Sequence, residues 1–299
     1  MTAIADDLLV LAPPKWPAGL RLPLQFARRK PVSAVAGVIV LVVCLLALLA
    51  PFISPYGPND VQLIARLKGP SSDHWFGTDQ FGRDVFSRVL FGARVSLAAG
   101  LGATAAGTGI GVLLGLMSGY AGGLVDLCLQ RVMDAIMALP PIILLMVLAT
   151  VLSPSLRNVT IAISILIMPG AARVVRGATL TAKEMMYIEA ARATGASPAR
   201  IVFRHVFPNV VAPIIVIASI TVGSVIIIEA ALGFLGLSVP PPTATWGNML
   251  NVGAQTYMER APWLALAPGA AIAVTVFSIN LLGDGLRDVL DPRLRGRGK

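Results

Sequence analysis

Charged residues are scarce in this sequence. They make up 13% of its 299 residues, whereas hydrophobic residues make up 56%. A soluble globular domain carries about 25% charged residues, so this composition excludes an ordinary soluble fold. Cysteine and histidine are rarer still, with two residues of each. His74 and His205 have no second ligand three or four positions away, and Cys44 and Cys128 lie in separate segments. The sequence therefore predicts neither a metal site nor a disulfide framework.

Two catalytic signatures are also missing. None of the five lysines stands in the Gly-Lys-Ser/Thr context of a phosphate-binding loop, so we expect no ATP hydrolysis by this chain. The stretch Gly115–Tyr120 contains Ser118, but no glycine precedes that serine by two positions and no predicted span supplies a histidine. We therefore predict no catalytic residue.

Long apolar runs are what the sequence has in abundance. About 20 apolar residues, at 1.5 Å each, cross the ~30 Å hydrocarbon core of a bilayer. The first run is too long for the apolar part of a cleaved signal peptide, so we interpret it as a retained helix. The predicted fold is an all-α membrane protein with six transmembrane helices. The spans are 32–53, 95–119, 135–153, 158–176, 209–235 and 263–283.

The distribution of lysine and arginine predicts the orientation. An even number of spans places both ends on one side, and cytoplasmic segments carry the excess of positive charge. The two tails (1–31 and 286–299), the turn after the second span and the loop after the fourth together hold seventeen of the 24 Lys and Arg residues. We therefore expect both tails to be cytoplasmic, on either side of a membrane domain at 32–285. This excess suits anionic lipid headgroups, and nucleic-acid binding is not needed to explain it.

The loop between the fourth and fifth spans carries its own helix signals. A capping box formed by Thr181 and Glu184 predicts the start of one helix, and Gly195 predicts its end. Ser197 followed by proline predicts the start of a second helix, which should end before Pro208. Such a loop has more structure and more apolar surface than a solvated linker needs, so we expect it to contact a partner or the membrane interface.

The stretch EAARATG, followed by HVFP, resembles the EAA loop of the membrane subunits of ABC importers. The similarity extends over most of the chain and is greatest to the dipeptide, oligopeptide and nickel branch of the binding-protein-dependent transport inner membrane components. It implies that loop 181–208 holds a coupling helix that docks on a cytoplasmic ATPase. The pattern departs from the family at Phe207, which stands where leucine is usual. The residues that match the motif are Glu189, Ala190, Ala191, Gly195 and Pro208.

A second stretch, His74–Leu97, resembles the segment that precedes the second span in the same permeases. It places Gly77, Asp79, Arg83 and Asp84 in an outer segment of turns and charge pairs. Three roles remain open for this segment: a gate over the pathway, a docking surface for a binding protein, or an element that only packs on the bilayer.

Three further features concern the spans. Glu229 is the only acid in the fifth span and lies ~32 Å along the helix from Pro208, so we expect it to border an outer vestibule or to make a structural hydrogen bond. Trp246 is expected to anchor at the membrane interface. Glycines recur every fourth residue from Gly107 to Gly119. Such a ridge favours helix packing within the chain, and contact with a second subunit remains open.

The resemblance implies the transmembrane subunit of an ATP-driven importer of peptides in the cell membrane. Its partners would be a second homologous permease subunit, cytoplasmic ABC ATPase subunits, an extracytoplasmic substrate-binding protein and the lipid bilayer. No cofactor is expected on this chain, because ATP and Mg would bind the ATPase partners. Two alternatives stay open: a permease of the same family for nickel or another small solute, and a self-sufficient secondary transporter or channel.

Overall fold

The computed structural model describes residues 26–28 and 30–290, so most of the two predicted tails lies outside the described residues. Within that part of the chain the fold is helical, and the sole β-type pairing is an isolated bridge between Thr78 and Asp84. The helices are α2 (Pro31–Leu48), α3 (Ala50–Ile53), η1 (Leu63–Ala65), α4 (Val85–Ala121), α5 (Gly123–Met137), α6 (Pro141–Leu152), α7 (Leu156–Lys183), α8 (Met186–Ala193), α9 (Pro198–Ile201), the π-helical turn Val202–Val206, α10 (Phe207–Phe234), α11 (Trp246–Thr256) and α12 (Trp263–Leu290).

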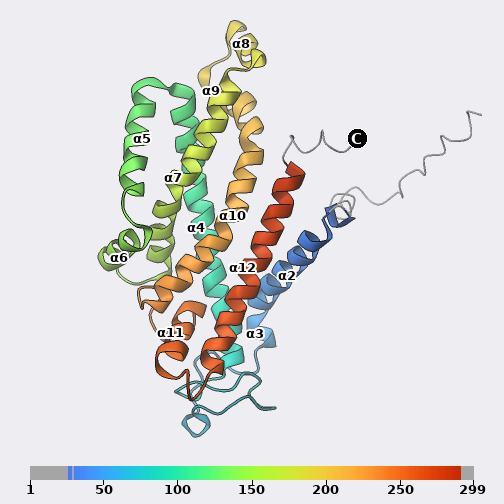
Figure 1. Cartoon of the computed structure of the whole chain (residues 1–299), viewed down its shortest axis with the longest axis vertical. Coiled ribbons are helices and arrows are strands. Elements are labelled where there is room, and N and C mark those ends of the chain that lie inside the picture. Colours follow the sequence, from blue (N-terminus) through green and yellow to red (C-terminus); the bar gives the residue numbers. More distant parts are fainter. Residues whose placement is uncertain (1–25, 29, 291–299) are drawn as a thin grey trace, which may run out of the picture.

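The long helices form an elongated bundle around α4, which runs most of the length of the molecule (Figure 1). The α4–α7 pair is the most extensive helix contact among the described residues. The glycine ridge explains it: a Cβ at Gly111 would lie 2.7 Å from the Ala171 side chain, and one at Gly115 would lie 2.6 Å from the Ala172 carbonyl oxygen. The ridge therefore packs within the chain, as the sequence favoured.

Five helices in the described part of the chain are long and apolar enough to cross a membrane, and the number rises to six if the bent pair α5–α6 is one span. This count agrees with the predicted fold class. The third expected span, 135–153, differs in form, because the helix breaks between Met137 and Pro141 and the two parts meet at 92°. Consecutive prolines explain the break, since the residue before a proline avoids the α conformation.

Two other helices, α4 and α12, overrun their predicted limits. α4 begins at Val85 instead of near residue 95, because Asp84 caps it by accepting a hydrogen bond from the Ser87 backbone N–H. α12 continues to Leu290, into the range predicted as a tail. Beside it, α2 packs on α12 and α4, and Lys30 forms an ion pair of 2.6 Å with Asp288.

The chain from Pro198 to Phe234 is continuously helical, so the expected end before Pro208 is wrong. A π-helical turn at Val202–Val206 closes with a bond from the Phe207 N–H to the Val202 carbonyl. That turn places Pro208 in the first turn of α10, where a missing N–H costs little. The side chain of Asn209 then donates to the His205 carbonyl at 2.6 Å.

The end of the bundle opposite α8 has its own apolar core. Trp246, at the start of α11, is only 1% exposed and donates its indole N–H to the Val89 carbonyl at 3.0 Å. The expected interfacial anchor is thus a buried link between α11 and α4. Thr245 and Asn248 form a capping box that sets the start of α11.

Candidate functional site

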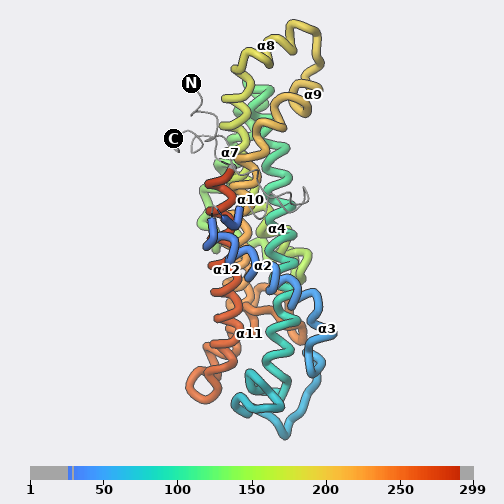
Figure 2. The backbone as a smooth tube through the Cα atoms, turned by 90° about the vertical axis from the view of Figure 1, so that its right-hand side faces the viewer, coloured from blue at the N-terminus to red at the C-terminus, as the bar shows by residue number. Residues whose placement is uncertain are grey.

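The loop that resembles the EAA motif lies at one end of the molecule. α8 projects beyond the ends of α5 and α10, opposite the 54–84 segment (Figures 1 and 2). The capping box predicted at Thr181 is wrong, because α7 extends through this residue and its hydroxyl donates to the Gly177 carbonyl at 3.2 Å. α8 begins instead after a short break at Glu184 and Met185.

The glycine turn between α8 and α9 is confirmed. Gly195 has a φ of +77°, a conformation that residues with a Cβ rarely adopt. Its N–H donates to the Arg192 carbonyl at 2.9 Å, which ends α8 as expected. Ser197 then caps α9 by accepting from the Arg200 N–H, and proline occupies the first turn.

The loop has one face that holds it to the bundle and another that faces outward. Ile188, Ala191 and Ile201 are buried in an apolar cluster with side chains of α4 and α7. Glu189 and Ala190, which match the motif, are exposed. Two large apolar side chains beside them, Met186 and Phe203, are also exposed. Of the motif residues, Ala191 therefore packs against the bundle, whereas Glu189 and Ala190 face outward.

Two arginine–aspartate pairs brace this end of the bundle. Arg176 of α7 donates two hydrogen bonds, of 2.6 and 2.5 Å, to the carboxylate of Asp126 of α5. The Ser118 hydroxyl of α4 also donates to Asp126. Arg173 contacts Asp134 at 2.6 Å. These pairs tie α5 to α7 below the loop.

At the opposite end, the structure brings the predicted outer residues into one charge cluster. Arg83 donates its Nε–H to Asp79 at 2.6 Å. Asp84 caps α4 and lies 2.9 Å from the Nδ1 of His74. Gly77 has a φ of +73°, and a Cβ there would lie 2.7 Å from both the Lys68 carbonyl and the Trp263 indole nitrogen. The glycine therefore lets the segment lie directly against α12.

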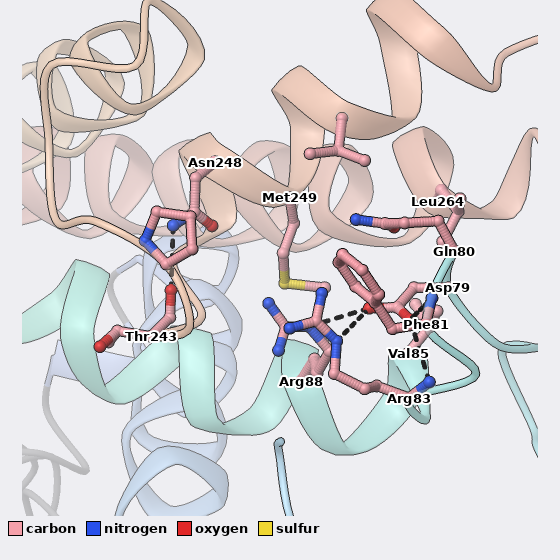
Figure 3. Close-up of a pocket in the computed structure, with 12 residues that line it drawn as sticks. Asp79, Gln80, Phe81, Arg83, Val85, Arg88, Thr243, Asn248, Met249 and Leu264 are labelled. Carbon is pink, nitrogen blue, oxygen red and sulfur yellow. Dashed lines mark hydrogen bonds and ion pairs between the residues drawn. The ribbon is translucent and has the colours of Figure 1, made fainter. Parts of the chain in front are cut away.

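These charges border a partly open pocket of about 100 Å³ (Figure 3). Asp79, Arg83 and Arg88 form its charged wall, while α11 contributes Asn248 and Met249. The wall also includes the linker between α10 and α11, so the pocket joins segments that are distant in sequence. The remaining lining residues are Gln80, Phe81, Val85, Pro241, Thr243, Val252 and Leu264.

Arg88, one of the charged residues of the predicted outer segment His74–Leu97, is the central residue of this cluster. It donates to the Pro58 carbonyl at 2.8 Å and lies 3.6 Å from the Asp79 carboxylate. Its position five residues after Arg83, on the first turn of α4, was the available signal. Its partner Pro58 lies 30 residues earlier, and no local pattern predicts so distant a contact.

Glu229 lies five residues before the end of α10 and does not face an open surface. Its side chain is 0% exposed and accepts a hydrogen bond of 3.0 Å from the Ser238 hydroxyl. In this conformation it makes the structural hydrogen bond that was one of its two expected roles. A role at the vestibule stays a prediction. Ser238 follows Glu229 by nine residues, beyond the range of helical spacing.

The described residues hold no group of three or more His, Cys, Asp or Glu side chains that could bind a metal ion. The geometry instead defines a multi-pass helical membrane protein with a structured loop at one end and a charged pocket at the other.

Comparison with known proteins identifies the family. The profile of the "Binding-protein-dependent transport system inner membrane component" family matches residues 111–296. The profile "N-terminal TM domain of oligopeptide transport permease C" matches residues 25–70. The chain belongs to the binding-protein-dependent transport system inner membrane components, as the motifs indicated.

Several relatives are similar over most of their length. The glutathione transport system permease protein GsiD of Pectobacterium atrosepticum is 44% identical over 268 residues, 89% of each chain. The dipeptide transport system permease protein DppC of Alkalihalophilus pseudofirmus is 42% identical over 263 residues, 88% of this chain and 86% of that one. The probable D,D-dipeptide transport system permease protein DdpC of Escherichia coli is 42% identical over 267 residues, 89% of each chain.

Proposed function

We propose that this chain is the transmembrane subunit of an ATP-driven importer and forms part of the translocation pathway for peptides that an extracytoplasmic binding protein delivers. The names of its relatives, which include dipeptide and glutathione permeases, support the cargo. The observation that carries the mechanism is the loop at residues 181–208, which is anchored on its inner face and presents Glu189 and Ala190 outward.

The proposed mechanism follows from this anchoring. ATPase subunits in the cytoplasm bind ATP and Mg, and their closure moves α8. Because Ile188 and Ile201 are buried against α4 and α7, a displacement of α8 is transmitted to the spans instead of being absorbed by a flexible loop. The pathway, shared with a second homologous permease subunit, then opens outward to receive the peptide, and ATP hydrolysis resets it.

Purification of the tagged chain in mild detergent tests this proposal. We expect an ATPase subunit to co-purify with the wild-type chain and to be lost, or to hydrolyse ATP without transport, in Glu189→Lys. The charge reversal acts on an exposed carboxylate that makes no hydrogen bond or ion pair within the described residues, so the fold should survive. Mass spectrometry, ATPase assay and peptide uptake give the readouts.

Glu184→Lys is the matched control. Glu184 is also exposed and lies five residues earlier, at the break before α8, so this variant should keep its ATPase. Equal loss in both variants would indicate a general charge effect instead of a specific contact. A stable chain that transports without an ATPase partner would contradict the importer hypothesis and favour a secondary transporter. Uptake competition between dipeptides and nickel separates the two candidate cargoes.

A further inference from the structure

The outer pocket carries positive charge that its own residues do not neutralise. Its wall contains the guanidinium groups of Arg83 and Arg88 but only one carboxylate, that of Asp79. All three side chains are at least nine-tenths buried. Figure 3 shows both arginines directed at the same carboxylate. Two positive charges thus share one negative charge where water screens them poorly.

The two arginines differ in how their donors are used. Arg88 is a clamp: one Nη donates to the Pro58 carbonyl at 2.8 Å and lies 3.5 Å from the Pro242 carbonyl. Arg83 uses its Nε–H for Asp79, and within the described residues its two Nη groups have no protein acceptor. Its guanidinium lies over the Phe81 ring, 4.7 Å from the centroid, which restrains the plane of the group.

An arginine held on one side and free on the other presents a pair of N–H donors. That geometry matches the two oxygens of a carboxylate. The excess positive charge favours the same ligand and repels an ammonium group. Apolar side chains of Val85, Met249 and Leu264 lie in the same pocket, where they can contact the carbon atoms next to such a carboxylate.

We propose that this pocket binds the C-terminal carboxylate of the transported peptide, with Arg83 as the bidentate donor. A volume of about 100 Å³ admits a chain end and little more. A stable protein–protein interface covers about 800 Å² on each partner, far more than this pocket offers, which favours the peptide over a docked protein. The proposal rests on the proposed function and adds to it the part of the cargo that is recognised.

Equilibrium binding of radiolabelled trialanine and of its C-terminal amide tests the proposal. The purified transporter complex, in lipid nanodiscs and without the binding protein, should bind trialanine at least about tenfold more tightly than the amide, because one charge-assisted hydrogen-bonded pair is lost. This arm needs no mutation. Arg83→Gln should weaken binding of trialanine by a similar factor and leave binding of the amide unchanged.

Two further variants separate charge from structure. Asp79→Asn keeps the oxygen that accepts from the backbone N–H groups of Phe81 and Arg83 but replaces the oxygen that accepts from the Arg83 Nε–H with an amide nitrogen. It should therefore weaken binding of trialanine and leave binding of the amide unchanged, because Arg83 loses the acceptor that orients its guanidinium. Arg66→Gln is the matched control, since Arg66 belongs to the same outer segment, is exposed and does not line the pocket. It should leave both affinities unchanged.

Several results would overturn the proposal. One is equal binding of trialanine and the amide to the wild-type complex, and another is equal loss of both in Arg83→Gln. A third is the absence of trialanine binding to a complex that still imports peptide with ATP, an outcome that leaves the proposed function intact. If Arg83→Gln weakens association with the binding protein and not with trialanine, the carboxylate belongs to an acidic side chain of that protein. Failure of ATP-driven peptide uptake by the wild-type complex would instead contradict the proposed function.

Discussion

Single glycines set the distance between the two most closely packed helices. Along α4, each glycine of the ridge faces the backbone or a side chain of α7, and an added Cβ would approach within 3.0 Å of it. Gly109, on the same helix, has no atom within 4 Å of the place where a Cβ would be. The difference separates glycines that allow close approach from one that does not.

Gly111→Ala should destabilise the protein by about 1–3 kcal/mol, because overpacking a tight helix contact forces backbone shifts. The new methyl group would lie 2.7 Å from both the Ala171 side chain and the Met168 carbonyl. Thermal unfolding of the purified chain measures the effect. Gly109→Ala is the control and should be neutral or slightly stabilising, because alanine favours the helix and meets nothing. A Gly111→Ala variant as stable as Gly109→Ala would contradict the packing described.

The sequence predicted which helices are present more accurately than the residues at which each helix begins and ends. Long apolar runs predict spans because hydrophobic thickness fixes their length, and every predicted run contains helix in the structure. The predicted limits were wrong for two different reasons. The start of α4 is set by a local cap at Asp84 that lies before the apolar run, and a π-helical turn carries the helix through Pro208, which was expected to end it. Pro140 and Pro141, at the start of α6, were a visible signal for the 92° bend, which the apolar pattern of the segment did not indicate.

The two ends of the molecule were predictable to different degrees. The loop 181–208 was partly predictable. Its glycine turn and Ser-Pro cap act over a few residues and were predicted correctly, whereas the capping box at Thr181 and the helix end before Pro208 were wrong. The outer pocket was not predictable, because contacts such as Arg88 to Pro58 and Trp246 to Val89 join residues 30 and 157 positions apart. The burial of Glu229 was also unpredictable, because it depends on how the surrounding helices pack and not on the local sequence.

The bent α5–α6 pair should depend on the bidentate contact between Arg176 and Asp126. We expect a double-mutant cycle on Arg176→Gln and Asp126→Asn to give a coupling of about 1 kcal/mol, because both side chains are partly buried and two charge-assisted bonds join them. Thermal unfolding of the four proteins measures it.

The pair Arg131–Asp134 provides the comparison within the same helix. It is longer, at 3.6 Å, and Arg131 is largely exposed, so removing that contact with Arg131→Gln should change stability by less than about 0.5 kcal/mol. A coupling near zero for Arg176 and Asp126 would mean that apolar packing alone holds α5 against α7. The double charge exchange, Arg176→Asp with Asp126→Arg, should recover part of the stability that either single reversal loses.

The two ends of the molecule differ in structure. α8 lies at one end and the 54–84 segment at the other (Figure 2). The loop 181–208, at the α8 end, is one of the segments that together hold most of the lysine and arginine residues. The positive-inside rule predicts that the α8 end is cytoplasmic. The proposed function needs this orientation, since the ATPase partners and the peptide must reach opposite ends.

Cysteine labelling in intact cells tests the orientation. In a background of Cys44→Ala and Cys128→Ala, we introduce Ser72→Cys in the outer segment or Ala193→Cys in α8, both at exposed positions. A membrane-impermeant maleimide should label the first directly and the second only after permeabilisation. The permeabilised sample controls for residues that a partner covers. The opposite pattern would place the coupling loop outside the cell, where no cytoplasmic ATPase can reach it, and both the importer mechanism and the outer carboxylate site would then fail together.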